Sequence, residues 1–353
     1  MSTIELRSIT KRFPGVIALD NVTFDVKDGE FFVLLGPTGA GKTTTLRVIA
    51  GLERQDEGNV LFDGEAVDNL TPPDRDVAFV FQQYSLYPTM TVFDNLAFPL
   101  RSPLRKLSAA EIKQRVEDAA RTLRISHLLE RKTAHLSGGE MQRVSIGRAI
   151  VRQPRVFLMD EPLSNLDAKL REALRVELQH LQRTQGSTTL FVTHDQVEAL
   201  TLAHRIGVLS EGRLIQIGTP EDIYDRPAST FVAQLVGTPR INLFPGLCEN
   251  GTVYAEGSEL HLPLPRSASI PQRFLLGVRP EDVTINPEGQ YTGEVLLTEP
   301  LGVETIVHIG TGQQRLLSLV PGITPLRVGD NVRFDVTHNR LHCFDLDGKR
   351  IPT

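Results

Sequence analysis

The run Gly36-Pro37-Thr38-Gly39-Ala40-Gly41-Lys42-Thr43 constrains the fold more than any other feature, because it matches the pattern G-x-x-x-x-G-K-[ST]. It directly follows a strand-like apolar segment at residues 31–35 and precedes a helical segment that begins at Thr44. Glycines let backbone N–H groups turn toward an anion, and a helix start directs its positive dipole end to the same place. The sequence therefore predicts a phosphate-binding loop in an α/β fold, with Lys42 on the β- and γ-phosphates and the Thr43 hydroxyl on Mg²⁺. The alternative is an ordinary glycine-rich turn, although a chance match in this chain is on the order of one in a hundred.

Two adjacent carboxylates, Asp160 and Glu161, follow the apolar run at residues 156–159. Hydrolysis of a phosphoanhydride uses one group on the metal and a second one on the attacking water. We therefore expect Asp160 to bind Mg²⁺ and Glu161 to direct the water. A solvated turn would explain two acids at a strand end equally well, and it is the phosphate-binding loop that favours the catalytic interpretation.

The first two thirds of the chain alternate apolar runs with helical patterns. Four runs, at residues 31–35, 77–81, 156–159 and 188–193, predict buried strands of a mainly parallel sheet covered on both faces. A one-faced stripe of leucines at residues 166–181 predicts a helix packed on that sheet. Charged residues with helical spacing predict an exposed helical insertion at residues 109–130.

After about residue 236 the pattern changes to short alternating stretches broken by glycine and proline, which predicts a small β-rich domain. Asp347-Gly348 is typical of a hairpin turn. A chain of 353 residues is also long for one core. We expect two domains, at residues 1–235 and 236–353.

Composition excludes several classes of protein. The net charge of -5 and the pI near 6.0 give no electrostatic reason to expect a nucleic-acid partner. The two cysteines, Cys248 and Cys343, have no metal-ligand spacing, and neither a disulfide framework nor a zinc site is expected. No run approaches the ~18–20 apolar residues of a spanning helix, and the N-terminus lacks the continuous apolar stretch of a signal peptide. Any attachment to a membrane is therefore expected to come through a partner.

Residues 136–140, with the sequence Leu-Ser-Gly-Gly-Glu, resemble the signature motif of ABC ATPases, which is usually written with Gln where this chain has Glu140. Further segments follow in the order of that family. Gln82 resembles the glutamine of its Q-loop, residues 164–167 resemble its D-loop, His194 resembles its switch histidine, and Phe13 lies where the family places an aromatic on adenine. This set resembles the ATP-binding subunits of ABC transporters over most of residues 1–235.

The resemblance implies a P-loop NTPase fold with a RecA-like core and a helical subdomain at about residues 84–152, which uses ATP and Mg²⁺. Glu161 and His194 are the implied catalytic residues, and Thr43, Gln82 and Asp160 are the implied Mg²⁺ ligands. The implied ATP contacts are Phe13, Gly36, Pro37, Thr38, Gly39, Ala40, Gly41, Lys42, Thr43, Thr44, Gln82, Ser137, Gly138, Gly139, Glu140 and Asp167. Simpler roles stay open for some of them: Ser137 as a helix cap, Gln82 and His194 as structural polar groups, and Phe13 as a core aromatic.

In this family the signature segment of one subunit closes over ATP held by another, which implies a homodimer. The expected further partners are two membrane-spanning permease subunits, bound near residues 82–88, and an external substrate-binding protein, with the chain on the cytoplasmic face of the inner membrane. Residues 277–282 and 299–302 resemble the OB-type (TOBE) extension of importers in the carbohydrate-uptake branch, which favours a sugar or polyol. Importers of polyamines, iron or oxyanions, and a soluble ABC ATPase, remain as alternatives.

Overall fold

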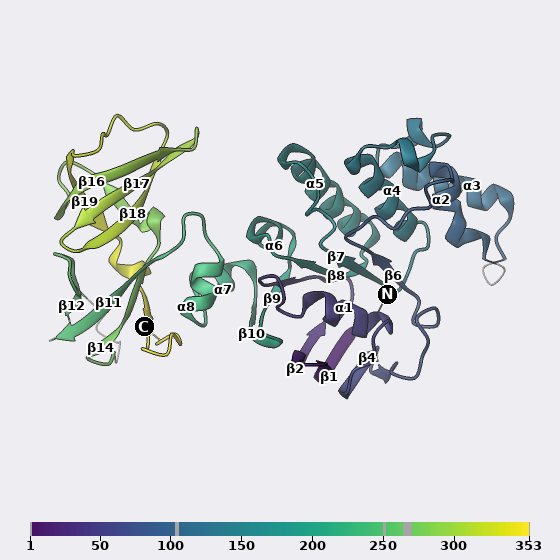
Figure 1. Cartoon of the computed structure of the whole chain (residues 1–353), viewed down its shortest axis with the longest axis horizontal. Coiled ribbons are helices and arrows are strands. Elements are labelled where there is room, and N and C mark those ends of the chain that lie inside the picture. The colour runs from purple at the N-terminus through teal and green to yellow at the C-terminus, as the bar shows by residue number, and fades with distance from the viewer. Residues whose placement is uncertain (1, 103–105, 250–251, 264–269, 353) are drawn as a thin grey trace. The chain divides into compact units, whose positions relative to one another are not determined.

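The computed structural model describes residues 2–102, 106–249, 252–263 and 270–352 (Figure 1). The chain divides into two compact units, Met1–Pro220 and Glu221–Thr353. This division differs from the boundary at residues 235/236 that the sequence suggested, because helices α7 (Pro220–Asp225) and α8 (Thr230–Leu235) go almost entirely with the second unit. No helix of the described residues is long and apolar enough to cross a bilayer.

A six-stranded sheet forms the centre of the first unit, in the order β10-β9-β3-β8-β7-β6. Neighbouring strands run parallel except for β9 and β10. Every residue of β3, β7 and β8 is buried, as their continuous apolar sequences predicted. The strands are β3 (Phe31–Leu35), β6 (Val77–Val80), β7 (Val156–Asp160), β8 (Thr188–Thr193), β9 (Arg205–Ser210) and β10 (Arg213–Gly218).

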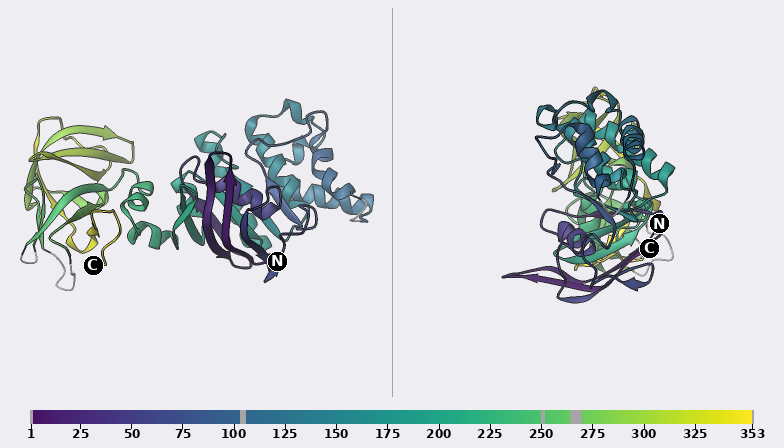
Figure 2. Two further views of the ribbon diagram at one scale, coloured as in Figure 1. Left: turned by 60° about the horizontal axis from the view of Figure 1, so that its bottom comes forward. Right: turned by 90° about the vertical axis from the view of Figure 1, so that its right-hand side faces the viewer.

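An antiparallel sheet, in the order β2-β1-β4-β5, forms a second layer that is drawn in purple and blue in Figure 2. One hydrophobic core joins the two sheets and helix α1 (Lys42–Ala50), with Phe24 of the second sheet stacked on Phe32 of the first at a centroid distance of 5.1 Å. The phosphate-binding segment therefore begins a helix that both sheets hold. The strands are β1 (Ile4–Phe13), β2 (Val16–Val26), β4 (Glu57–Phe62) and β5 (Glu65–Ala66).

The remaining helices of the first unit flank this core, and α2, α3 and α4 gather on one side of it (Figure 1). Helices α3 and α4 both begin with a capping box, in which a serine and a glutamate three residues later satisfy each other's backbone N–H groups. The predicted leucine stripe lies on α5, where Leu174, Leu178 and Leu181 are buried. The helices are α2 (Val92–Ala97), α3 (Ala109–Thr122), α4 (Gly138–Ile150), α5 (Ala168–Gln185) and α6 (Gln196–Leu202), with short 3-10 turns at Phe98–Arg101, Ser126–Leu128 and Thr133–His135.

The second unit consists of two antiparallel five-stranded sheets that share one core, as the alternating pattern predicted. The sheet β15-β19-β16-β17-β18 closes almost into a barrel, because Ser318 Oγ on edge strand β18 donates to Val283 O on edge strand β15 at 2.7 Å. The strands are β11 (Asn242–Glu249), β12 (Thr252–Ala255), β13 (His261–Pro263), β14 (Arg273–Val278), β15 (Val283–Ile285), β16 (Tyr291–Pro300), β17 (Glu304–Thr311), β18 (Gln314–Pro321), β19 (Asn331–Val336) and β20 (His342–Phe344), with 3-10 turns at Pro280–Asp282 and His338–Arg340.

Arg279, which is almost fully buried, explains why α7 and α8 go with the second unit. Its guanidinium donates to the carbonyl oxygens of Ala233 at 3.1 Å, Val236 at 2.5 Å and Tyr224 at 2.7 Å. The last carbonyl groups of a helix have no hydrogen-bond donor within the helix. The buried Arg279 supplies donors to these carbonyl groups at the end of α8.

Candidate functional site

The phosphate-binding loop connects β3 to α1 and lies at the carboxyl end of the parallel strands. Gly41 has φ of 103°, which is in the left-handed region, and a Cβ at this position would lie 2.4 Å from Ala18 O. Only glycine fits there, and the close approach lets the first turn of α1 direct its N–H groups into the loop. Residues 36–44 thus form the predicted loop and helix start as one continuous segment.

Lys42 is 4% exposed, and its ammonium group lies between the loop and the carboxylate of Glu161. Nζ donates to Gly36 O at 2.9 Å and to Pro37 O at 3.0 Å, and it lies 3.4 Å from Glu161 Oε1. A positive charge held at this point between backbone carbonyls and a carboxylate is placed to compensate a triphosphate bound in the loop.

Thr43 and Asp160 form a second pair, since Thr43 Oγ1 donates to Asp160 Oδ1 at 2.9 Å. Burial, reinforced by the nearby Glu161 charge, raises the pKa of Asp160 although the Thr43 hydroxyl opposes this shift. A hydroxyl and a carboxylate are hard oxygen donors that suit Mg²⁺, which usually keeps several waters and phosphate oxygens besides one or two protein ligands. Among the described residues, no group of three or more His, Cys, Asp or Glu side chains is arranged to hold a metal ion. The pair fits Mg²⁺.

Glu161 and His194 meet at the ends of neighbouring strands β7 and β8, with His194 Nδ1 3.0 Å from Glu161 Oε2. Glu161 has φ of 43°, which is unusual for a residue with a side chain, and its N–H donates to Val192 O at 3.1 Å. Such strain is retained where the surroundings hold a residue in a required orientation. Glu161 is 16% exposed and His194 52% exposed, so that the acid is enclosed while the imidazole reaches solvent.

Gln82 follows β6 and lies beside the D-loop segment, residues 164–167. Its Nε2 is 3.4 Å from Ser164 Oγ, and its backbone carbonyl accepts a hydrogen bond from Asn165 at 3.2 Å. Ser164 Oγ in turn donates to Glu161 O at 3.0 Å, which connects Gln82 to the backbone of Glu161. The structure thus places the Gln82 amide on Ser164, and Mg²⁺ ligation by Gln82 stays a prediction.

Asp167 begins helix α5, where its Oδ1 accepts a hydrogen bond from Leu170 N at 2.9 Å. This is an N-cap contact, which satisfies one of the unpaired N–H groups at the helix start. A contact of Asp167 with ATP stays a prediction.

The signature segment begins helix α4, with Ser137 as its N-cap. Ser137 N and Oγ both donate to Glu140 Oε2, at 2.8 and 2.9 Å, and Glu140 N approaches Ser137 Oγ at 3.4 Å. A Cβ on Gly139 would lie 1.9 Å from Leu170 Cδ2, so that glycine lets the first turn of α4 pack on the first turn of α5. Both the cap and the glycine therefore have structural roles, and an additional role in binding ATP stays a prediction.

The capping box accounts for Glu140, which departs from the usual signature motif, because glutamate and glutamine both serve in this position. We expect Glu140→Ala to speed hydrogen exchange of the backbone N–H groups in the first turn of α4 about fivefold, which corresponds to a loss of about 1 kcal/mol in local stability. Glu140→Gln, the matched control, should keep the protection at pH 7.

The same two chains give a pH test. The backbone N–H of Ser137, followed by its hydroxyl, lowers the pKa of Glu140 from its ordinary value of 4.5. A lowered pKa in the folded state adds stability above 4.5 that fades as the pH falls through the shifted pKa. The native chain should lose protection at acidic pH relative to Glu140→Gln, and equal protection at every pH would refute the capping role.

Phe13 ends strand β1 and is 41% exposed, with Lys11 Nζ 5.0 Å from the centre of its ring. It is therefore an accessible aromatic rather than a core residue. Its partner across the hairpin is Val16, two positions before the Ala18 carbonyl that closely approaches Gly41. Stacking on adenine stays a prediction.

The structure brings Lys42, Thr43, Asp160, Glu161 and His194 together at one edge of the parallel sheet. In the described part of the chain, no hydrogen bond or ion pair joins residues 137–140 to residues 36–44.

Sequence reasoning missed Arg75, which is 3% exposed and donates from Nη1 to Val48 O and Ile49 O, both at 2.8 Å. It caps the carboxyl end of α1, the helix that carries the phosphate-binding loop. No sequence motif marks this contact, because it joins segments about 26 residues apart through tertiary packing.

Comparison with known proteins identifies the family of the chain. Residues 19–164 match the domain family described as ABC transporter, and residues 276–344 match the TOBE domain. The sn-glycerol-3-phosphate import ATP-binding protein UgpC of Bordetella avium is 45% identical over 99% of both chains. The uncharacterized ABC transporter ATP-binding protein YurJ of Bacillus subtilis is 43% identical over 98% of both chains.

Among solved structures, a dimeric ATP-binding cassette in a post-hydrolysis state with ADP and Pi is 32% identical, with a TM-score of 0.56 over 62% of this chain and 98% of that one. A cassette of an ABC transporter in its ADP conformation is 27% identical, with a TM-score of 0.57 over 66% of this chain and 98% of that one. The chain therefore belongs to the ABC transporter ATP-binding proteins, and it is a transporter ATPase whose cassette is followed by a TOBE domain.

Proposed function

We propose that this chain powers the import of a sugar, sugar derivative or polyol, with sn-glycerol 3-phosphate as the first candidate. Several relatives that are 44–45% identical over 98–99% of this chain are named as sn-glycerol-3-phosphate import ATP-binding proteins. Uptake of a polyamine, iron or an oxyanion is the second candidate, because the C-terminal domain also resembles the extension of importers for those substrates.

The contact between Glu161 and His194 is the observation that carries the hydrolytic role. In the proposed reaction a water attacks the γ-phosphorus, Glu161 accepts the proton of that water, and the bond from the γ-phosphorus to the bridging oxygen breaks to leave ADP and phosphate. Lys42 compensates charge on the phosphates, and His194 orients the Glu161 carboxylate. Mg²⁺ held by Thr43 and Asp160 would supply further charge compensation.

Two copies of the chain are proposed to enclose two ATP molecules, each between the phosphate-binding loop of one copy and the signature helix of the other. The exposed Ser137 begins a helix of 13 residues, and such a helix start binds anions. The dimeric cassette among the solved neighbours supports this arrangement. ATP then favours the closed dimer because it contacts both copies only there, and hydrolysis releases that preference.

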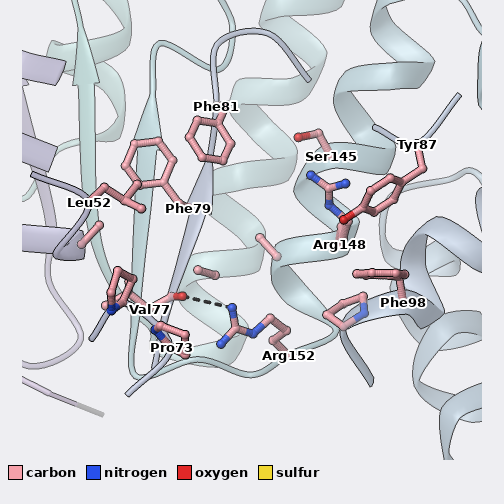
Figure 3. Close-up of a pocket in the computed structure, with 15 residues that line it drawn as sticks. Leu52, Pro73, Val77, Phe79, Phe81, Tyr87, Phe98, Ser145, Arg148 and Arg152 are labelled. Atoms are coloured by element: carbon pink, nitrogen blue, oxygen red, sulfur yellow. Dashed lines mark hydrogen bonds between the residues drawn. The ribbon is translucent and has the colours of Figure 1, made fainter. Parts of the chain in front are cut away.

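A groove between the ATP core and the helical segment is the proposed binding place for a permease subunit (Figure 3). Its volume is about 360 Å³, and its walls include the end of α1, strand β6 and helix α4. On one side of the groove the ring centroids of Tyr87 and Phe98 lie 4.7 Å apart, and Phe79 and Phe81 lie on the other side (Figure 3). An apolar segment bound there would touch both the phosphate-loop helix and the signature helix, so its movement would follow closure. The chain would thus work at the cytoplasmic face of the membrane.

The function is tested by purifying the chain with the permease encoded by neighbouring genes and measuring ATP hydrolysis with sn-glycerol 3-phosphate, maltose, putrescine and sulfate. We expect sn-glycerol 3-phosphate to stimulate hydrolysis, with the substrate-binding protein present. Stimulation by putrescine or sulfate alone would favour the second candidate.

In the same complex, Tyr87→Ala should remove the stimulation and leave hydrolysis by the isolated chain unchanged. Val176→Ala, an exposed position on α5, is the matched control. A Tyr87→Ala complex that is stimulated normally would argue against the groove as the permease site.

A further inference from the structure

Arg171 lies near the start of α5 and joins two loops of the ATP site. Its Nη2 donates to Leu166 O in the D-loop segment at 3.1 Å, and its Nη1 donates to Asp195 Oδ2 at 3.2 Å. Arg171 is 32% exposed and Asp195 23% exposed, which gives this ion pair partial shielding from solvent. The planar guanidinium can hold both acceptors at once, whereas a lysine could meet them only one at a time.

Asp195 directly follows the switch histidine and anchors its loop. Its Oδ1 accepts from Val197 N at 2.7 Å and caps α6, while its own N–H donates to Thr193 Oγ1 at 2.9 Å. Thr193 Oγ1 donates in turn to the buried Glu198 carboxylate at 2.6 Å. His194 therefore lies in the chain between Thr193 and Asp195, which are both fixed by hydrogen bonds.

These contacts close a ring around the catalytic acid. From Glu161 the ring passes through the Ser164 hydroxyl into the D-loop, through Leu166 O to Arg171, and through Asp195 to His194, whose imidazole returns to Glu161 at 3.0 Å. Arg171 is the member of this ring that joins the D-loop to the switch loop by side-chain contacts.

We propose that Arg171 is a positioning residue for ATP hydrolysis, which holds the D-loop and the switch loop in register so that His194 keeps the Glu161 carboxylate in its productive orientation. The proposal rests on the proposed roles of Glu161 and His194. It also means that a D-loop displaced by a neighbouring subunit would shift His194 through Arg171. A small displacement of a catalytic group is enough to lower the rate strongly.

The test measures kcat and the KM for ATP in variants of the full chain. We expect Arg171→Met to lower kcat by about 10-fold or more and to change equilibrium ATP affinity by less than about twofold, because Lys42 and Thr43 are untouched. Arg171→Lys should recover part of kcat. Asp195→Asn, which keeps a capping side chain but loses the charge, should lower kcat to a similar extent.

A comparison of single and double variants distinguishes this positioning role from a general loss of stability. The double variant Arg171→Met/Asp195→Asn should be no slower than Arg171→Met alone, since both changes break the same contact. Arg183→Met, an exposed arginine at the other end of α5, is the control and should keep the native kcat. Far-UV circular dichroism and ATP binding confirm that each variant is folded.

Three outcomes would overturn the inference, and they can be distinguished from one another. If Arg171→Met keeps a native kcat while Glu161→Gln is inactive, Arg171 has no positioning role and the proposed roles of Glu161 and His194 stand. If Glu161→Gln itself hydrolyses ATP at the native rate, the assumed catalytic acid is wrong and the inference falls with it. Additive losses in the double variant would also contradict it.

Discussion

Replacing Glu161 with glutamine is expected to lower kcat for ATP hydrolysis by about 10²–10⁴-fold, the range typical of a lost general base. Glutamine has nearly the same shape and can still meet His194, which lies 3.0 Å from the carboxylate, but it cannot accept a proton from water. Phosphate release under saturating Mg²⁺ and ATP measures this change.

The same variant should bind ATP at least as tightly as the native chain. The Glu161 carboxylate is 16% exposed and lies 3.4 Å from Lys42 Nζ, where its negative charge competes with the phosphates for the lysine. Removing that charge leaves Lys42, Thr43 and Asp160 in place. We therefore expect a dimer of Glu161→Gln that forms only with ATP and Mg²⁺ and persists because ATP is not consumed.

Light scattering after gel filtration follows that dimer, and Glu172→Gln, an exposed glutamate on α5, is the matched control. A native kcat for Glu161→Gln would show that another group directs the water.

Replacing Lys42 with methionine is expected to raise the Kd for ATP by roughly 30-fold or more, since loss of one partner of a buried charged contact costs about 2–5 kcal/mol. Lys42 is 4% exposed, and its ammonium group also satisfies the carbonyls of Gly36 and Pro37. Methionine fills a similar volume but provides neither charge nor donors. Titration with a fluorescent ATP analogue measures the change.

Lys27→Met, at an exposed lysine in the same unit, serves as the control for loss of a positive charge. Circular dichroism checks that the variant is folded, because the neighbouring acids Asp160 and Glu161 lose their nearest cation. Unchanged affinity in Lys42→Met would mean that the triphosphate does not occupy the loop.

Four of the six strands of the central sheet could be predicted from the sequence because they are largely buried, whereas β9 and the partly exposed β10 were not predicted. The runs at residues 31–35 and 188–193 are the observed β3 and β8. A continuous apolar run between turn residues leaves few other choices, and the periodic leucines of α5 are equally restrictive.

The division between the two units could not be predicted because it depends on contacts between distant residues. No change in composition marks the sequence around residue 220, and the buried Arg279 binds carbonyls 43 to 55 positions earlier in the chain. A single arginine in a sequence carries no signal of which helix end it will satisfy.

Motifs in the sequence indicated which residues belong to the candidate site, but they did not indicate all the contacts that those residues make. The phosphate-binding loop, Asp160, Glu161 and His194, which the motifs and the family resemblance indicated, meet because parallel strands bring their carboxyl ends to one edge. The left-handed backbone of Glu161 and the Arg171–Asp195 pair have no local pattern. Both arise from packing between segments, which propensity and periodicity do not report.

The central claim is that ATP is enclosed between two copies of the chain, and a crystal structure of Glu161→Gln with ATP and Mg²⁺ tests it most directly. We predict a symmetric dimer in which the triphosphate contacts Lys42 of one copy and Ser137 and Gly138 of the other. ATP bound wholly within one copy, with residues 136–140 of both copies far from any phosphate, would contradict the claim.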